Sequence, residues 1–248
     1  GVVMALPNSA NAMILYTDFG NGADSYIRSN FSDNGEADIN HGSEPLTWIK
    51  HDLGLNGNNR KSYLRFDLSG ITDPVTDISF EISYAGTDGS GANSNPPASP
   101  STYNVYGLND GVAGESWNES TITWNNAPGN DIASAGGLIG SATTLLGSFD
   151  LTFPPTVDGT RISLNTAALL GFFASDTDDL LTLILTRQQQ NTSVEYFAAK
   201  EDPNRVAPAL NITTQMIEPP TGVVPEPATI LLFGGGMVGA IMRRKIKA

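Results

Sequence analysis

Apolar and polar residues alternate along much of the chain, with the period of two that half-buried β-strands show. The clearest alternating runs are Ser62–Leu68 and Ile78–Tyr84. Further strands are predicted at Leu46–Lys50, Tyr103–Tyr106, Leu180–Thr186, Val194–Ala198 and Ala209–Thr213. Their number and spacing predict an all-β protein, folded as an antiparallel β-sandwich.

One segment, Asn165–Ala174, has a helical pattern instead. Asn165 is a suitable N-cap, and Leu169, Leu170 and Phe173 fall on one side of the predicted helix. The segment Gly86–Ser101 is rich in Gly, Ser, Asn and Pro, which predicts a long surface loop. The fold expected is therefore a sandwich with one short helix.

The chain is strongly acidic and contains no cysteine. Without Glu226 and the four cations of 243–247, 25 acidic and 9 basic residues remain, a net charge of about −16. This charge argues against nucleic acid as a partner and disfavours a strongly anionic polysaccharide, unless a local basic patch is present. The lack of cysteine excludes disulfides and thiolate chemistry.

The C-terminal segment has the order of a membrane-sorting tail. Ala228–Met242 carries no charge and precedes the basic residues Arg243, Arg244 and Lys245. Fifteen helical residues rise about 22 Å, short of the ~30 Å hydrocarbon core, so such a helix spans only with help from its flanks. A buried core helix is the alternative, but the four glycines within 234–239 disfavour it in water.

Before this segment stands Pro225-Glu226-Pro227. The arrangement closely resembles the PEP-CTERM sorting signal of Gram-negative bacteria that make exopolysaccharide. The resemblance implies that an exosortase cleaves at or near the tripeptide. The protein would then pass through the inner membrane to the cell envelope surface or the extracellular matrix.

Ala10-Asn11-Ala12 has the small-x-small form that signal peptidase accepts, with an ordinary N-terminal segment as the alternative. We expect residues 1–12 to be the remnant of a signal peptide whose start precedes residue 1. The predicted organisation continues with a β-sandwich domain at 13–214, a Pro-rich linker at 215–227, and a transmembrane helix with its basic stop at 228–248.

From Ala23 to Thr213 the order of motifs resembles the DNRLRE-type domain, which overlaps a family of carbohydrate-binding modules. The motif Trp117–Pro128 carries this resemblance most specifically. Lys200-Glu201 matches in part the Ser-Arg-Glu triplet that is usual in the family. Other matching pieces are Ala23–Arg28, Asn40–Ser43, Leu46–Lys50, Arg60–Leu68 and Ala207–Leu210. The resemblance implies a jelly-roll sandwich that binds polysaccharide.

Sugar recognition would use exposed aromatic faces beside amide and hydroxyl groups. The candidate contacts are Trp48, Trp117, Tyr103 and Tyr106, although large aromatic residues also commonly fill cores. Trp124 is expected to be buried or interfacial.

Asp24 and Glu201 stand near the first and a late strand, which can lie side by side in a jelly roll. Carboxylates gathered in this way suit a structural Ca²⁺. The alternative is an exposed carboxylate pair, or an ion pair with Arg28 or Lys200. No other cofactor is expected.

No catalytic site can be recognised. His41 and His51 have no spaced partners and are expected to be turn or surface residues. Two carboxylates could make a glycosidase, and Glu119 after Trp117 invites the idea, but acidic residues are too numerous to single out a pair. The sequence favours a non-enzymatic polysaccharide-binding protein, with a structural surface component or a hydrolase or lyase as alternatives.

Overall fold

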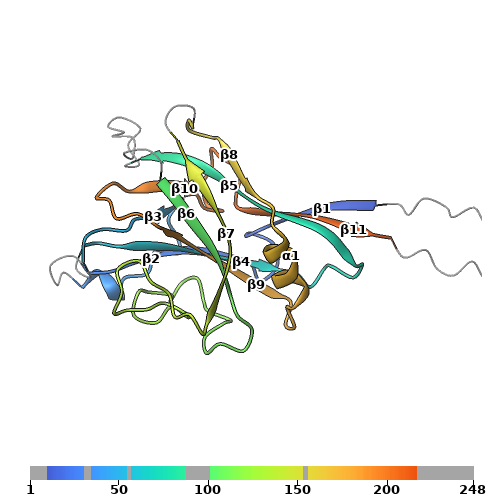
Figure 1. The fold of residues 1–248 in the computed structure, drawn as a ribbon, viewed down its shortest axis with the longest axis horizontal. Coiled ribbons are helices and arrows are strands. Elements are labelled where there is room, and N and C mark those ends of the chain that lie inside the picture. Colours follow the sequence, from blue (N-terminus) through green and yellow to red (C-terminus); the bar gives the residue numbers. More distant parts are fainter. Residues whose placement is uncertain (1–9, 31–34, 55–56, 88–100, 153–155, 217–248) are drawn as a thin grey trace, which may run out of the picture. The chain divides into compact units, whose positions relative to one another are not determined.

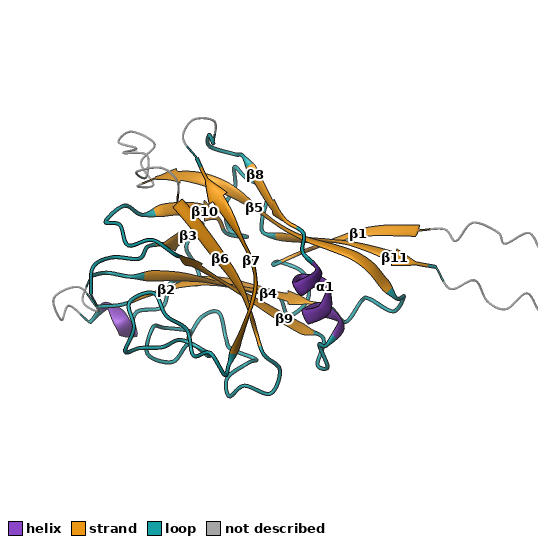
Figure 2. Ribbon diagram, in the orientation of Figure 1, coloured by secondary structure: helices purple, strands orange, loops and turns teal. Residues whose placement is uncertain are grey.

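The structure, a computed structural model, describes residues 10–30, 35–54, 57–87, 101–152 and 156–216. Within them, Ala10–Gln215 form one compact unit made of two antiparallel β-sheets, one α-helix and a 3-10 turn, η1 (Glu36–Asp38) (Figures 1 and 2). The predicted all-β sandwich with one short helix is confirmed. The segment predicted to cross the membrane lies outside the described residues.

One sheet has six strands in the order β1-β11-β5-β10-β3, with β8 pairing to β5. These strands are β1 (Ala10–Tyr16), β3 (Leu46–Ile49), β5 (Val75–Thr87), β8 (Arg161–Leu164), β10 (Glu195–Ala198) and β11 (Ala209–Gln215). The other sheet has five strands in the order β2-β4-β9-β6-β7. They are β2 (Ala23–Arg28), β4 (Arg60–Asp67), β6 (Ser101–Leu108), β7 (Thr143–Leu151) and β9 (Leu180–Arg187).

Both faces of the five-stranded sheet are covered, and β4 shows this most clearly because all eight of its residues are buried. Leu64 and Phe66 join the main core between the sheets. Tyr63 points to the opposite face, where it joins a second apolar cluster with Trp117 and Trp124 from the segment 109–142. This segment therefore packs over the outer face of the sheet as a second layer.

A buried ion pair joins the two sheets. Nη1 of Arg187 on β9 donates to Oε2 of Glu195 on β10 at 3.1 Å, and both side chains are almost fully buried. Arg187 Nη2 also donates to the hydroxyl of Ser101 on β6. Arg187 thus connects β9 and β6 of one sheet to β10 of the other through two buried polar contacts.

The only α-helix among the described residues, α1 (Ala167–Ala174), contacts β5 of one sheet and β7 of the other. Its N-cap is Thr166, whose side chain accepts a hydrogen bond from the backbone N–H of Leu169. The prediction of Asn165 as the cap was wrong by one residue, since Asn165 donates to Asp77 instead. Phe172 of α1 lies against Gly107, where a Cβ atom would come within 2.4 Å of the ring.

The predicted strand runs coincide with β3, β4, β5, β6, β9, β10 and β11, whereas β1, β2, β7 and β8 are not among them. The predicted signal peptidase site falls within β1, where Ala10, Asn11 and Ala12 pair with Gln215, Thr214 and Thr213 of β11. Cleavage after Ala12 would remove these three pairs. Most of the predicted loop at 86–101 lies outside the described residues, although its first two residues end β5 and its last begins β6.

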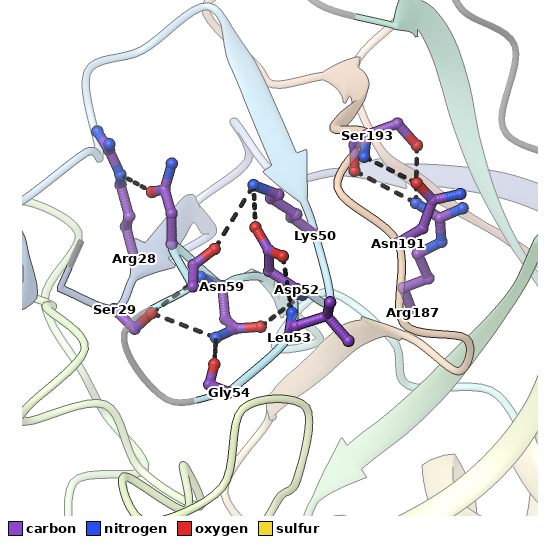
Figure 3. Close-up of polar contacts among 12 residues, drawn as sticks. Arg28, Ser29, Lys50, Asp52, Leu53, Gly54, Asn59, Arg187, Asn191 and Ser193 are labelled. Atoms are coloured by element: carbon purple, nitrogen blue, oxygen red, sulfur yellow. Dashed lines mark hydrogen bonds and ion pairs between the residues drawn. The ribbon is translucent and has the colours of Figure 1, made fainter. Parts of the chain in front are cut away.

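The connection between β3 and β4 is held by the side chain of Asn59 (Figure 3). The Nδ2 of Asn59 donates to the carbonyl of Gly54, and its Oδ1 accepts from the backbone N–H of Asp52. Asp52 also pairs with Lys50 at 2.5 Å. These contacts hold the residues that follow Trp48 on β3 against those that precede β4 of the five-stranded sheet.

Candidate functional site

A surface pocket of about 440 Å³ opens beside the turn at 116–120. Its lining includes the start of β2 and the preceding turn as well as the outer face of β4. The polar and aromatic residues that line it are Asn21, Arg65, Ser116, Trp117, Asn118, Glu119 and Ser120. The pocket therefore combines amide, hydroxyl, guanidinium and carboxylate groups with an indole.

Trp117 fixes one wall of this pocket. Its side chain is only 6% exposed, and the indole Nε1 donates to the hydroxyl of Thr182 on β9 at 3.1 Å. Its ring meets that of Tyr63 edge to face, with 6.1 Å between centroids. After Trp117 the chain turns sharply, because Asn118 Oδ1 accepts hydrogen bonds from both the backbone N–H and the hydroxyl of Ser120.

Arg65 of β4 connects the two walls of the pocket. Its Nε donates to the carbonyl of Asn21 at 2.9 Å, and its Nη1 donates to the carbonyl of Trp117. The guanidinium carbon lies 5.0 Å from the centre of the Trp117 ring, the arrangement of a cation–π contact. Burial lowers the pKa of Arg65 from its ordinary value, and nearby Glu119 opposes that shift.

Glu119 is one of three carboxylates that come close together beside the pocket. Asp24, Glu119 and Glu201 each bring an oxygen within 4.8 Å of the other two. The Oδ2 of Asp24 accepts hydrogen bonds from the Thr17 hydroxyl at 2.6 Å and from the Lys200 backbone N–H at 2.9 Å. Burial raises the pKa of Asp24 to about 7, and repulsion by Glu201 and Glu119 adds to the effect.

Lys200 contributes the one ammonium that the structure pairs with this cluster. Its Nζ lies 2.5 Å from Oε2 of Glu119 and 3.8 Å from Oε1 of Glu201. The structure thus brings the two predicted metal-site residues together and adds Glu119, which was not predicted as a ligand. Arg28, an alternative partner, pairs with Glu36 instead.

The backbone at Glu119 is held by the segment at 40–42. The Asn40 side chain donates to the carbonyls of Glu119 and Ile122, at 2.7 and 2.8 Å. At Gly42 a Cβ atom would lie 2.1 Å from the carbonyl oxygen of Glu119, so only glycine allows this close approach. Glu119 is consequently placed by contacts from sequence positions nearly 80 residues away.

A second group of aromatic side chains lies where β2 and β3 come together. Trp48 is partly exposed, and the Tyr26 ring lies parallel to it with 5.0 Å between centroids. On Tyr26 stacks His41, 4.2 Å away and only 8% exposed. His41 does begin a turn, because its carbonyl accepts a hydrogen bond from the backbone N–H of Glu44, but its side chain is buried and is not at the surface. His51, the other histidine, places its Nδ1 3.2 Å from the carbonyl of Gln188.

The four candidate sugar contacts do not form one cluster. Only Trp117 lines the pocket. Tyr103 is fully buried and stacked on Phe149, so its ring has no exposed face on which a sugar could stack. Tyr106 is partly buried against the second apolar cluster, while Trp48 lies on β3 of the other sheet. Trp124 is also buried, with the Lys61 ammonium 4.5 Å from its ring centre.

Comparison with protein families decides the class of the domain. Residues 16–152 match carbohydrate-binding module family 96. The chain belongs to this family. The matched region runs from the end of β1 through β7 and contains Asp24, Arg65, Trp117 and Glu119, but it ends before Glu201. No curated protein matches the chain.

Residues 223–245 match the PEP-CTERM protein-sorting motif, as the sequence predicted from Pro225-Glu226-Pro227. This motif implies exosortase-dependent sorting, export and a cell-surface or extracellular location in a Gram-negative bacterium. The tripeptide, the apolar segment and the basic residues Arg243, Arg244 and Lys245 lie outside the described residues. In the part of the chain that the structure describes, no helix has the length and apolar character needed to cross a bilayer.

Proposed function

We propose that the exported domain, residues 13–214, is a non-catalytic module that binds polysaccharide at the pocket beside Trp117. The PEP-CTERM tail would deliver it to the cell envelope surface or the extracellular matrix, where exopolysaccharide is its ligand. Membership of carbohydrate-binding module family 96 is the observation that carries this proposal.

The chemistry of the pocket supports this use. Sugar hydroxyls both donate and accept hydrogen bonds, and amide and hydroxyl side chains offer both functions. Asn118 and Ser120 present such groups in the pocket that Trp117 also lines. A volume of about 440 Å³ also lies in the range of small-molecule sites. The pocket thus suits one or two sugar units of a longer chain.

The carboxylates beside the pocket are poorly placed for hydrolysis. A glycosidase needs two carboxyl groups that flank the scissile bond. Asp24 is only 1% exposed, so a substrate cannot reach it. Both oxygens of Glu119 are engaged, one by the Asp24 backbone N–H and the other by Lys200. We therefore favour binding over catalysis.

A glycan array probed with the purified full chain in mild detergent tests the proposal. The array carries neutral and acidic polysaccharides, and the blocking variant is Ser116→Trp. Ser116 is exposed and lines the pocket, so the large ring should fill it without disturbing the core. We expect at least about a tenfold loss of affinity, equal to 1.4 kcal/mol. The control Ser141→Trp, at an exposed turn position elsewhere, should bind normally.

Three results would contradict the proposal. If no glycan is bound, a structural role in the surface layer replaces it. Release of reducing sugars from a bound glycan would favour the hydrolase alternative instead. Equal binding by both tryptophan variants would place the sugar site away from this pocket.

A further inference from the structure

We propose that Asp24, Glu119 and Glu201 form a binding site for a hard divalent cation, with Ca²⁺ as the probe. The three residues come from distant parts of the chain. Asp24 lies on β2, Glu119 in the turn after Trp117, and Glu201 in the turn that follows β10. A cation here would join the first strand of the five-stranded sheet to two loops.

The spacing of the carboxylates matches a shared ion. Ca²⁺ binds carboxylate oxygens at 2.3–2.6 Å, so two ligands on opposite sides of one ion are about 5 Å apart. One oxygen from each of Asp24, Glu119 and Glu201 lies within 4.8 Å of the other two. One ion placed between these oxygens could therefore contact all three residues, with the Lys200 ammonium displaced from Oε2 of Glu119.

The state of Asp24 points independently to a missing partner. Its side chain is 1% exposed, and its Oδ1 receives no hydrogen bond from any residue that the structure describes. Buried carboxylate oxygens are normally paired, because leaving one without a partner carries the full cost of removing it from water. The two donors that Asp24 does have, Thr17 and the Lys200 backbone, both bind Oδ2. A cation would supply the partner that Oδ1 lacks.

The charges also leave a place for a divalent ion. Three carboxylates and the Lys200 ammonium sum to two negative charges. Lys200 contacts Glu119 and lies near Glu201, so it does not satisfy Oδ1 of Asp24. Glu201 is exposed, which lets an ion enter from solvent and lets water complete its coordination.

A second acidic cluster, made of Asp110, Glu115 and Asp178, is a useful comparison. Its ligand oxygens also lie within 4.8 Å of one another, but none of the three residues is buried. Asp110 Oδ2 already accepts hydrogen bonds from the backbone N–H and the hydroxyl of Thr177. The Oε1 of Glu115 also receives no hydrogen bond from the described residues, but Glu115 is only half-buried and Asp110 and Asp178 are exposed, so this cluster serves as the control site.

The test is calorimetry on the full chain in mild detergent at pH 8, after treatment with a chelator and without glycan. Ca²⁺ at 100 times its Kd should raise Tm by roughly 5 to 10 °C. The variant Glu201→Gln should lose this rise, and the matched control Glu115→Gln should keep it. Without Ca²⁺, Glu201→Gln should melt no lower than the wild type, because it removes a charge that repels Asp24.

The inference fails if Ca²⁺ leaves Tm of the wild type unchanged. It also fails if the rise persists in Glu201→Gln, or if Glu115→Gln is the variant that abolishes it. Because no sugar is present, these outcomes are independent of whether the pocket beside Trp117 binds polysaccharide.

Discussion

Lys61 shows how single polar residues hold the outer layer on the five-stranded sheet. Its Nζ donates to Oδ1 of Asn130 at 2.7 Å and to the carbonyl of Gly137, and it lies over the Trp124 ring. All three partners belong to the segment 109–142. Burial lowers the pKa of Lys61 to about 7, and the charge of Asp131 opposes this shift.

This shift predicts a pH dependence of stability. Between about pH 7 and the ordinary value of 10.5, the unfolded chain holds a proton that folded Lys61 has lost. The free energy of unfolding therefore rises with pH in this window, by at most about 1.4 kcal/mol per unit, and falls as the pH is lowered towards 7. The variant Lys61→Met lacks this contribution. Urea unfolding of both proteins at several values between pH 7 and 10 measures the difference.

We expect the wild type to gain stability relative to Lys61→Met at each step upward in pH. Parallel curves for the two proteins would contradict the prediction. They would mean that Lys61 stays charged inside the fold, supported by Trp124 and its two acceptors.

At the candidate site the sequence predicted some residues and missed others for a physical reason. Asp24 and Glu201 were expected to approach each other, since their strands can be neighbours in a jelly roll. Glu119 could not be added from spacing, because its place depends on how the segment 109–142 packs and on contacts from Asn40 and Gly42. Tyr103 was offered as a sugar contact, since the pattern of a short strand does not show which face is buried.

At the scale of elements, the sequence predicted strands whose apolar and polar residues alternate regularly, but it missed β7, where they do not. The buried apolar residues of β7 are Leu146, Phe149 and Leu151, spaced by three and then two, so no period of two is visible. The cause is an irregularity in its pairing with β6, where the register shifts between Val105 and Tyr106. β8 was also missed, although Ile162 and Leu164 alternate with Arg161 and Ser163 along its four residues.

The start of α1 supplies a prediction at this scale. Thr166→Ala removes the hydroxyl that caps the backbone N–H of Leu169 and also donates to the Leu146 carbonyl on β7. Loss of an N-cap costs about 1 kcal/mol, and the lost contact to β7 adds to it. The neighbouring Asn165→Ala is the control, because Asn165 makes only an exposed contact with Asp77.

Urea unfolding should therefore show a lower midpoint for Thr166→Ala than for Asn165→Ala. Equal midpoints would show that the cap contributes little once α1 packs on the two sheets. A larger decrease of the urea midpoint in Asn165→Ala would indicate that Asn165, and not Thr166, is the N-cap.

At the scale of the whole molecule, stability rests on two apolar clusters, one between the sheets and one under the segment 109–142. The sequence contains no cysteine, so no disulfide supports them. The length of the chain is sufficient for this, because the fraction of surface buried on folding rises with size. The second cluster includes Trp117, so the layer that stabilises the sheet also forms the wall of the proposed sugar pocket.

The sorting motif and the sandwich should be separable in function. The compact unit ends at Gln215, and Pro225-Glu226-Pro227 begins ten residues later in the sequence. Glu226→Ala should leave Tm of the domain unchanged, because substitutions away from a core have small effects on stability. It should also retain uncleaved protein in the inner membrane, since the apolar segment and its basic residues remain while the exosortase loses its recognition element.

Cell fractionation and immunoblotting measure both the size and the location of the variant. Glu218→Ala removes the same charge outside the tripeptide and should be sorted normally. If Glu226→Ala reached the surface at the normal size and amount, the tail would act as a plain membrane anchor rather than as a sorting signal.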